Sequence, residues 1–179
     1  PNAGGTYCLL TDEDQLISGP QNQKEKGQVL RVADGARRSH LLTFRGTNRM
    51  LVNKQFAYLH QGENLTALDR GSYVDLQDEK RQLLAKQAAI AKQLKGRKND
   101  QTLKSQHSET GSRIQMLTTS LPKCFKWKIP CGHPIGFAMG GNTLYVGGDG
   151  IVMAFNASNG KKQWSAKVDG KAYGLAISN

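Results

Sequence analysis

The chain of 179 residues carries 25 Lys and Arg against 14 Asp and Glu, which gives a formal net charge of +11, and 37% of its residues are hydrophobic. Twenty glycines and the lack of a long polar tract favour a turn-rich β protein over a disordered chain. No window approaches the roughly 18 unbroken apolar residues of a membrane span, so no transmembrane segment is predicted.

Short apolar runs separated by polar turns mark the N-terminal segment as β structure. The predicted strands are Tyr7–Leu10, Leu16–Gly19 and Val29–Val32. Asp12–Asp14 is predicted to form a turn and Gln21–Gly27 a polar loop. These elements make up a first unit over residues 4–45.

An internal repeat with an offset of 87 residues relates the middle of the chain to its C-terminal part. The matched segments are Phe56–Leu59 with Thr143–Val146, and Leu65–Asp69 with Val152–Asn156. Tyr58 and Tyr145 therefore occupy equivalent positions. The repeat predicts a second unit over residues 48–75 that continues at 121–131, a third over 134–167, and the start of a fourth at Tyr173–Ser178.

Between Ser72 and Leu121 the hydrophobic period changes to that of a helix. Apolar residues recur at helical spacing from Leu76 to Leu94 and again from Leu103 to Leu121, on either side of a polar turn. We therefore expect a helical hairpin over residues 76–120, inserted within the second unit.

Most of the net charge lies in and just after this hairpin, because residues 76–128 hold twelve Lys or Arg and four Asp or Glu. The candidate partner-binding residues cluster around its tip and are Lys92, Lys95, Arg97, Lys98 and Lys104. Such a patch can contact phosphates, anionic lipid or an acidic protein surface, although a solvated charged face is its commonest role. The hairpin has no aromatic residue to stack on bases, which favours a protein partner over nucleic acid.

The segment from Asn142 to Trp164 contains three short predicted strands, the first two at Leu144–Val146 and Val152–Phe155, separated by two turns. Asp149-Gly150 tolerates positive φ and favours the tight turns that join antiparallel strands, so Gly150 is a predicted structural residue. A second break at Ser158–Gly160 precedes a strand that leads to Trp164.

The order of residues from Tyr145 to Trp164, Tyr-Val-Gly-x-Asp-Gly-x-Val-x-Ala-Phe-Asn-x-x-x-Gly-Lys-x-x-Trp, resembles one blade of the quinoprotein-like β-propellers related to pyrroloquinoline-quinone (PQQ) dehydrogenases, which include bacterial repeat proteins. That family's turn reads Ala-x-Asp-x-x-Thr-Gly, and Asn156 and Asn159 stand here for the Asp and the Thr. Trp127 and Trp164 fall where the family packs core tryptophans between blades.

The resemblance implies an all-β fold: a partial β-propeller of about three four-stranded antiparallel blades, plus the start of another, with an inserted α-helical hairpin. The expected domains are residues 1–75 and 121–179 for the blades and 76–120 for the hairpin. Propellers close with about four to eight blades, so the sequence is interpreted as a fragment of a longer polypeptide. The resemblance also implies an extracytoplasmic setting, in the periplasm or at the cell surface.

No arrangement of residues in the chain specifies catalysis, and no catalytic residue is assigned. The histidines form no recognisable dyad with a Ser or Cys. Cys131 and His133, with Cys124 nearby, match no standard metal spacing, so no metal ligand is assigned and the cysteines are interpreted as structural thiols. The glycine pairs at 140–141 and 147–148 are followed by strands rather than helices, which indicates hairpin turns and not a phosphate cradle.

The predicted function is that of a non-catalytic propeller segment, an interaction scaffold in a larger protein that binds a protein partner or the remaining blades. The alternative is a fragment of a quinone-dependent dehydrogenase, for which the resemblance implies PQQ and calcium as cofactors; no residue of this segment is assigned to them. A second alternative is binding of nucleic acid or another anionic surface through the basic hairpin.

Overall fold

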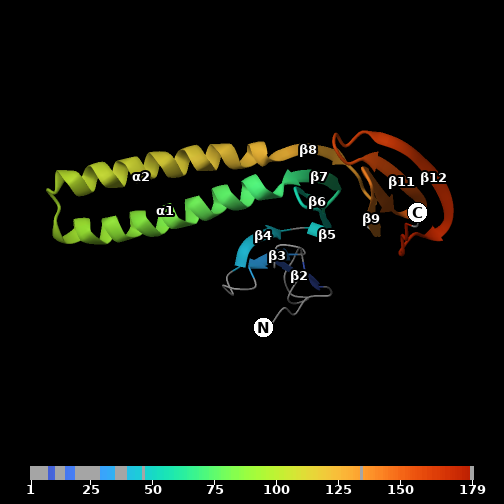
Figure 1. Cartoon of the computed structure of the whole chain (residues 1–179), viewed down its shortest axis with the longest axis horizontal. Coiled ribbons are helices and arrows are strands. Elements are labelled where there is room, and N and C mark those ends of the chain that lie inside the picture. Colours follow the sequence, from blue (N-terminus) through green and yellow to red (C-terminus); the bar gives the residue numbers. More distant parts are fainter. Residues whose placement is uncertain are drawn as a thin grey trace. The chain divides into compact units, whose positions relative to one another are not determined.

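The structure, a computed structural model, describes residues 8–10, 15–18, 29–34, 40–45, 47–133 and 135–177. These residues form three four-stranded antiparallel sheets and a pair of long helices (Figure 1). The prediction of four-stranded antiparallel sheets combined with a helical hairpin is confirmed. Tyr7, the turn at Asp12–Asp14 and the loop at Gln21–Gly27 lie outside the described residues.

Each sheet is a meander in which strands that follow one another in the sequence pair antiparallel. Sheet A contains β1 (Cys8–Leu10), β2 (Gln15–Ser18), β3 (Val29–Asp34) and β4 (His40–Arg45). Sheet B contains β5 (Thr47–Val52), β6 (Phe56–Gln61), β7 (Asn64–Asp69) and β8 (Phe125–Pro130). Sheet C contains β9 (Gly136–Gly140), β10 (Thr143–Gly147), β11 (Asp149–Asn156) and β12 (Lys162–Lys171).

The strands of sheet C repeat those of sheet B at the offset of 87 residues that the sequence predicts. This offset carries β5, β6 and β7 onto β9, β10 and β11. The repeat is seen most clearly in one row of three neighbouring side chains that crosses each sheet. We call it the Tyr-Ala-Trp row. Its members, opposite one another in the strand register, are Tyr58, Ala67 and Trp127 in sheet B, and Tyr145, Ala154 and Trp164 in sheet C.

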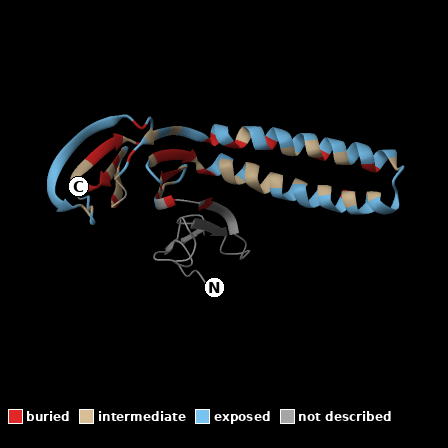
Figure 2. Ribbon diagram, turned by 180° about the vertical axis from the view of Figure 1, so that it is seen from behind, coloured by how far each residue is buried: buried red, intermediate tan, exposed pale blue. Residues whose placement is uncertain are grey.

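A hydrophobic core lies between sheets B and C (Figure 2), where alternate residues of each strand face the other sheet. Sheet B contributes the face that carries its Tyr-Ala-Trp row. Sheet C contributes the face opposite its own row, so its row points away from sheet B. The buried members of this core are Tyr58, Leu65, Ala67, Cys131, Leu144, Val146, Met153, Phe155 and Ala157.

A tight turn with Asp149 and Gly150 at its centre leads from β10 into the first residues of β11, as the Asp-Gly dipeptide predicts. Gly147 pairs with Val152, and the amide of Gly148 donates to the carbonyl of Ile151 at 2.8 Å. Gly150 has a φ of +71°, a left-handed conformation in which a residue with a Cβ is strained. The short apolar runs on either side can therefore pair in register.

The helices α1 (Arg70–Gly96) and α2 (Gln101–Ser120) form an antiparallel hairpin that ends in a short 3₁₀ turn, η1 (Leu121–Cys124). Residues 71–124 make up a compact unit separate from the sheets. Three buried residues of α2, Leu103, Thr110 and Leu117, recur every seven positions, which is the spacing of a two-helix seam. The remaining faces of both helices are largely exposed (Figure 2).

Helix α1 begins at Arg70, earlier than the boundary expected near residue 76. The amide of Arg70 donates to the carbonyl of Gln55 at 2.9 Å, so a first-turn amide that the helix leaves unpaired is satisfied by the sheet unit. Strand β7 therefore runs directly into the helix. The stretch from Arg70 to Asp75 has its large apolar side chains only at the adjacent positions Tyr73 and Val74, and so lacks the helical spacing that would have indicated this start.

The start of a fourth unit is not formed, because residues 172–177 contain no strand. Strand β12 instead extends to Lys171, past the expected end at 167. The amide of Ala172 then donates to the carbonyl of Gly148 at 3.0 Å. The following residues lie over three glycines of sheet C, since a Cβ built at Gly136, Gly140 or Gly147 would meet Ala172, Leu175 or Ile177.

Candidate interaction surfaces

The contact between sheets B and C includes the Trp127 indole lying on the turn that joins β11 to β12. Its Nε1–H donates to the carbonyl of Ala157 at 3.0 Å. Gly160, with a φ of +70°, faces the ring so closely that a Cβ there would lie 2.8 Å from a ring carbon. Glycine at this position therefore permits both the turn and the approach of the indole.

Two asparagines hold that turn in shape. The side-chain oxygen of Asn156 accepts from the amide of Ser158 at 2.9 Å, and that of Asn159 accepts from the amide of Lys161 at 2.9 Å. The amide of Gly160 also donates to the carbonyl of Asn156 at 2.8 Å. Side-chain bonds of this kind are typical of Asn in turns, so these two residues act structurally.

Tyr58 completes the sheet B side of the contact, with its ring centroid 6.1 Å from that of Trp127. Tyr58 is buried, and burial raises the pKa of its phenol above the ordinary value. The neutral phenol and the indole thus form an aromatic pair within the core. Both residues, selected in the sequence as structural, lie at the interface between sheets.

The equivalent row of sheet C has the same internal geometry, on the face of that sheet over which residues 172–177 lie. The ring centroids of Tyr145 and Trp164 lie 6.0 Å apart, and Ala154 between them is fully buried. Trp164 itself is 45% exposed, and its indole N–H has no hydrogen-bond partner among the described residues. The surface that sheet B uses for docking is therefore repeated on sheet C.

The five cations selected from the sequence are all brought together around the tip of the hairpin, and all five are exposed. Lys92 and Lys95 lie near the end of α1, Arg97 and Lys98 in the connecting turn, and Lys104 at the start of α2. Within the described part of the chain, none of them forms an ion pair. The carboxylate among them, Asp100, is engaged as the N-cap of α2, where it accepts from the amide of Leu103 at 3.0 Å.

Nearer the base of the hairpin, two arginines have acidic partners. Arg113 of α2 forms a bidentate salt bridge with Glu79 of α1: its Nε donates to Oε1 at 2.7 Å and its Nη2 donates to Oε2 at 3.0 Å. The same bond lowers the pKa of the Glu79 carboxyl below its ordinary value. Arg81 pairs with Asp78 at 2.7 Å within α1. The uncompensated positive charge is thus concentrated at the tip.

The connection from β8 to β9, which carries Cys131 and His133, is pinned by backbone hydrogen bonds. The amide of Cys131 donates to the carbonyl of Glu63 at 2.7 Å, and Nε2 of His60 donates to the carbonyl of Cys131 at 2.7 Å. His60 is 1% exposed, and its Nδ1 has no partner in the described residues. The sequence singled out neither Glu63 nor a role for His60, since their contacts with the connection lie far along the chain.

The thiol of Cys131 is free and buried, and burial raises its pKa above the ordinary value. A protonated thiol is a poor nucleophile and a poor metal ligand. Among the described residues, no three His, Cys, Asp or Glu side chains gather closely enough to hold a metal ion.

Neither helix of the described chain is both long enough and apolar enough to span a bilayer. In comparisons with known proteins, no family model matches the chain. No curated protein is significantly similar to it in sequence.

Replacing Gly160 with Ala should destabilise the sheet unit by about 3 kcal/mol, because the methyl group would displace the Trp127 ring and the residue would keep a left-handed φ. Gly170→Ala is the matched control, since Gly170 has a φ of +75° but open space around its Cβ position. The control should lose only about 1 kcal/mol, the cost of the conformation. Urea unfolding followed by tryptophan fluorescence measures both, and equal losses would contradict the docking role of Gly160.

The stability of the sheet unit should fall as the pH drops below about 6.5, because burial lowers the pKa of His60 below its ordinary value. In that range the unfolded chain binds a proton that the native state excludes, so stability is lost by at most roughly 1.4 kcal/mol per pH unit until the native pKa is reached. The variant His60→Gln should show a flatter pH profile of the unfolding free energy. His107→Gln, which removes a histidine of α2, is the matched control, and equal flattening of the profile by both variants would contradict the assignment to His60.

Proposed function

We propose that this chain is a β-propeller repeat segment that acts as a non-catalytic interaction scaffold. The observation that carries the proposal is the repeated Tyr-Ala-Trp row, of which one copy is docked on a neighbouring sheet and the other ends in the exposed Trp164. Sheet C binds Trp127 of sheet B and carries an exposed tryptophan, Trp164, of its own. A further sheet could therefore pack on Trp164 as sheet C packs on Trp127. Stacking of such units is how repeat proteins bury their faces.

Two further features support a propeller. The sheets are all four-stranded antiparallel meanders, the form of a propeller blade. The turn from Asn156 to Gly160 carries the blade-type pattern of the quinoprotein-like family, and the Trp127 indole lies on it. Under this proposal the setting is extracytoplasmic, as in the proteins that the segment resembles.

Within this scaffold the helical hairpin serves as a docking arm for an acidic protein surface. Five exposed cations without ion-pair partners, in the described chain, present a positive potential at its tip. The tip offers no aromatic side chain for stacking on bases, which makes a protein the favoured partner over nucleic acid. Charge of this kind mainly accelerates and orients association.

The propeller proposal is tested on the intact protein labelled with 5-fluorotryptophan, in which the ¹⁹F signal lost in Trp164→Phe is that of Trp164 and the Trp127 contact stays in place. If a further sheet docks on this row, the Trp164 signal should move little when H₂O is replaced by D₂O, as expected for a buried side chain. The Trp127 signal, assigned in the same way with Trp127→Phe, gives the reference for a docked tryptophan. A solvent shift of the Trp164 signal clearly larger than that of the Trp127 signal would show that no sheet covers Trp164.

The docking arm is tested by charge reversal at the tip. The double variant Arg97→Glu, Lys98→Glu should bind poly-L-glutamate at least about tenfold more weakly at low salt, which corresponds to roughly 1.4 kcal/mol. The control is Lys80→Glu, Lys86→Glu, which makes the same change in net charge away from the tip and should lose less than about threefold. Equal losses, or tighter binding to duplex DNA than to poly-L-glutamate, would overturn the assignment of an acidic protein partner.

A further inference from the structure

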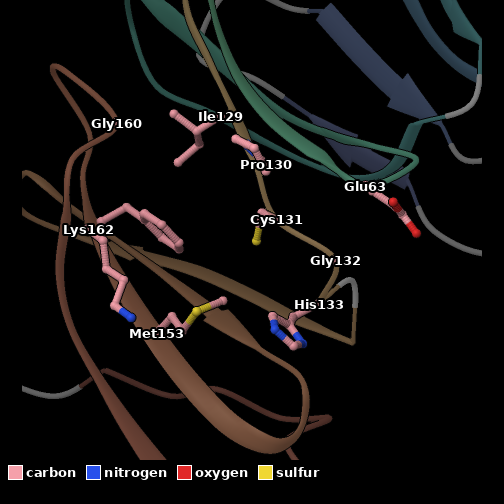
Figure 3. A pocket seen from close by; sticks show the side chains of 10 residues that line it. Glu63, Ile129, Pro130, Cys131, Gly132, His133, Met153, Gly160 and Lys162 are labelled. Carbon is pink, nitrogen blue, oxygen red and sulfur yellow. The ribbon is translucent and has the colours of Figure 1, made fainter.

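An open cavity of about 580 Å³ lies where the chain passes from sheet B to sheet C (Figure 3). Its wall is built by the end of β8, the connection after it, strand β11 and the start of β12. A cavity of this volume is within the range of sites that hold small organic ligands. It is distinct from the Trp164 surface and from the hairpin.

The floor of the cavity is apolar. Ile129 from β8 and Met153 and Phe155 from β11 line it, and the last two are less than 10% exposed. The sulfur of Cys131 points into the space above them (Figure 3). Because this thiol is held protonated, as its raised pKa indicates, it adds a soft, weakly polar wall and no charge.

The rim is polar and unevenly charged. Lys162 lies on one side of the opening, and His133 and Glu63 lie on the other (Figure 3). Lys162 is exposed and has no ion-pair partner within the described chain. An anionic group beside its ammonium would be placed away from the Glu63 carboxylate.

The wall on the Cys131 side is rigid before any ligand arrives. Both backbone polar groups of Cys131 are engaged, by Glu63 and by the buried His60. At the other end of the connection, the amide of Ile135 donates to the carbonyl of Gly147 at 3.0 Å. A preorganised wall of this kind reduces the ordering cost of binding.

We propose that this cavity binds a small molecule with an apolar body and a single carboxylate: the body on the Ile129, Met153 and Phe155 floor, and the carboxylate paired with the Lys162 ammonium. The inference is independent of the scaffold role. It requires only the packed pair of sheets B and C.

The test uses the full chain labelled with ¹³C-methyl methionine and titrated with 4-phenylbutyrate or its uncharged analogue 4-phenylbutan-1-ol. The Met153 methyl signal, assigned with Met153→Leu, should shift on addition of the acid. The signal of Met116, an exposed residue of α2, should not move. The acid should bind at least about fivefold more tightly than the alcohol, since a charge-assisted contact is lost in the alcohol.

Lys162→Gln should reduce the affinity for the acid to that for the alcohol, whereas Lys161→Gln, a change at the adjacent exposed lysine, should leave it unchanged. Lack of a Met153 shift with either compound at millimolar concentration would overturn the proposal. So would equal affinity of the acid and the alcohol for the unmodified chain. An identical effect of both lysine variants would overturn the assignment of Lys162 to the carboxylate.

Discussion

The approach of the Trp127 indole to the Gly160 backbone is the contact on which the arrangement of sheets B and C depends. It joins the last strand of one sheet to the last turn of the next, with a hydrogen bond from the indole nitrogen to Ala157 and no room for a side chain at position 160. An aromatic ring that is fixed at its edge and covered on its face sets both the distance and the orientation of the two sheets. The alternating apolar residues then interdigitate as the core described above.

The cavity beside this contact follows from the same geometry. The chain must cross from the outer strand of sheet B to the first strand of sheet C, and it does so through Cys131 and His133. Because Trp127 occupies the turn side of the interface, the crossing segment leaves an opening bounded by Met153 and Lys162. A packing requirement thus creates a space with an apolar floor and a cation at its rim.

Local sequence signals predicted the tight turns, the repeat and the hairpin, because each depends on residues close together in the chain. The turns at Asp149-Gly150 and at residues 156–161 are closed by hydrogen bonds between residues a few positions apart, so the local sequence is enough to predict them. The start of α1 and the end of β12 depend on partners distant in sequence, Gln55 for Arg70 and Gly148 for Ala172, and were misplaced. The cavity, too, required tertiary structure, since Cys131, Met153 and Lys162 share no local motif.

The insertion of the hairpin between β7 and β8 has a consequence for the folding of sheet B. These paired strands are separated by residues 70–124, so their register forms only after a long loop has closed, whereas β5 to β7 are connected by short turns. Antiparallel helices form locally and quickly and bring the two ends of the insertion toward each other, which shortens the effective loop. The ion pair between Asp69 and Lys126, at 3.3 Å, then holds the two strands at the point of entry. The hairpin would thereby accelerate completion of the sheet that it interrupts.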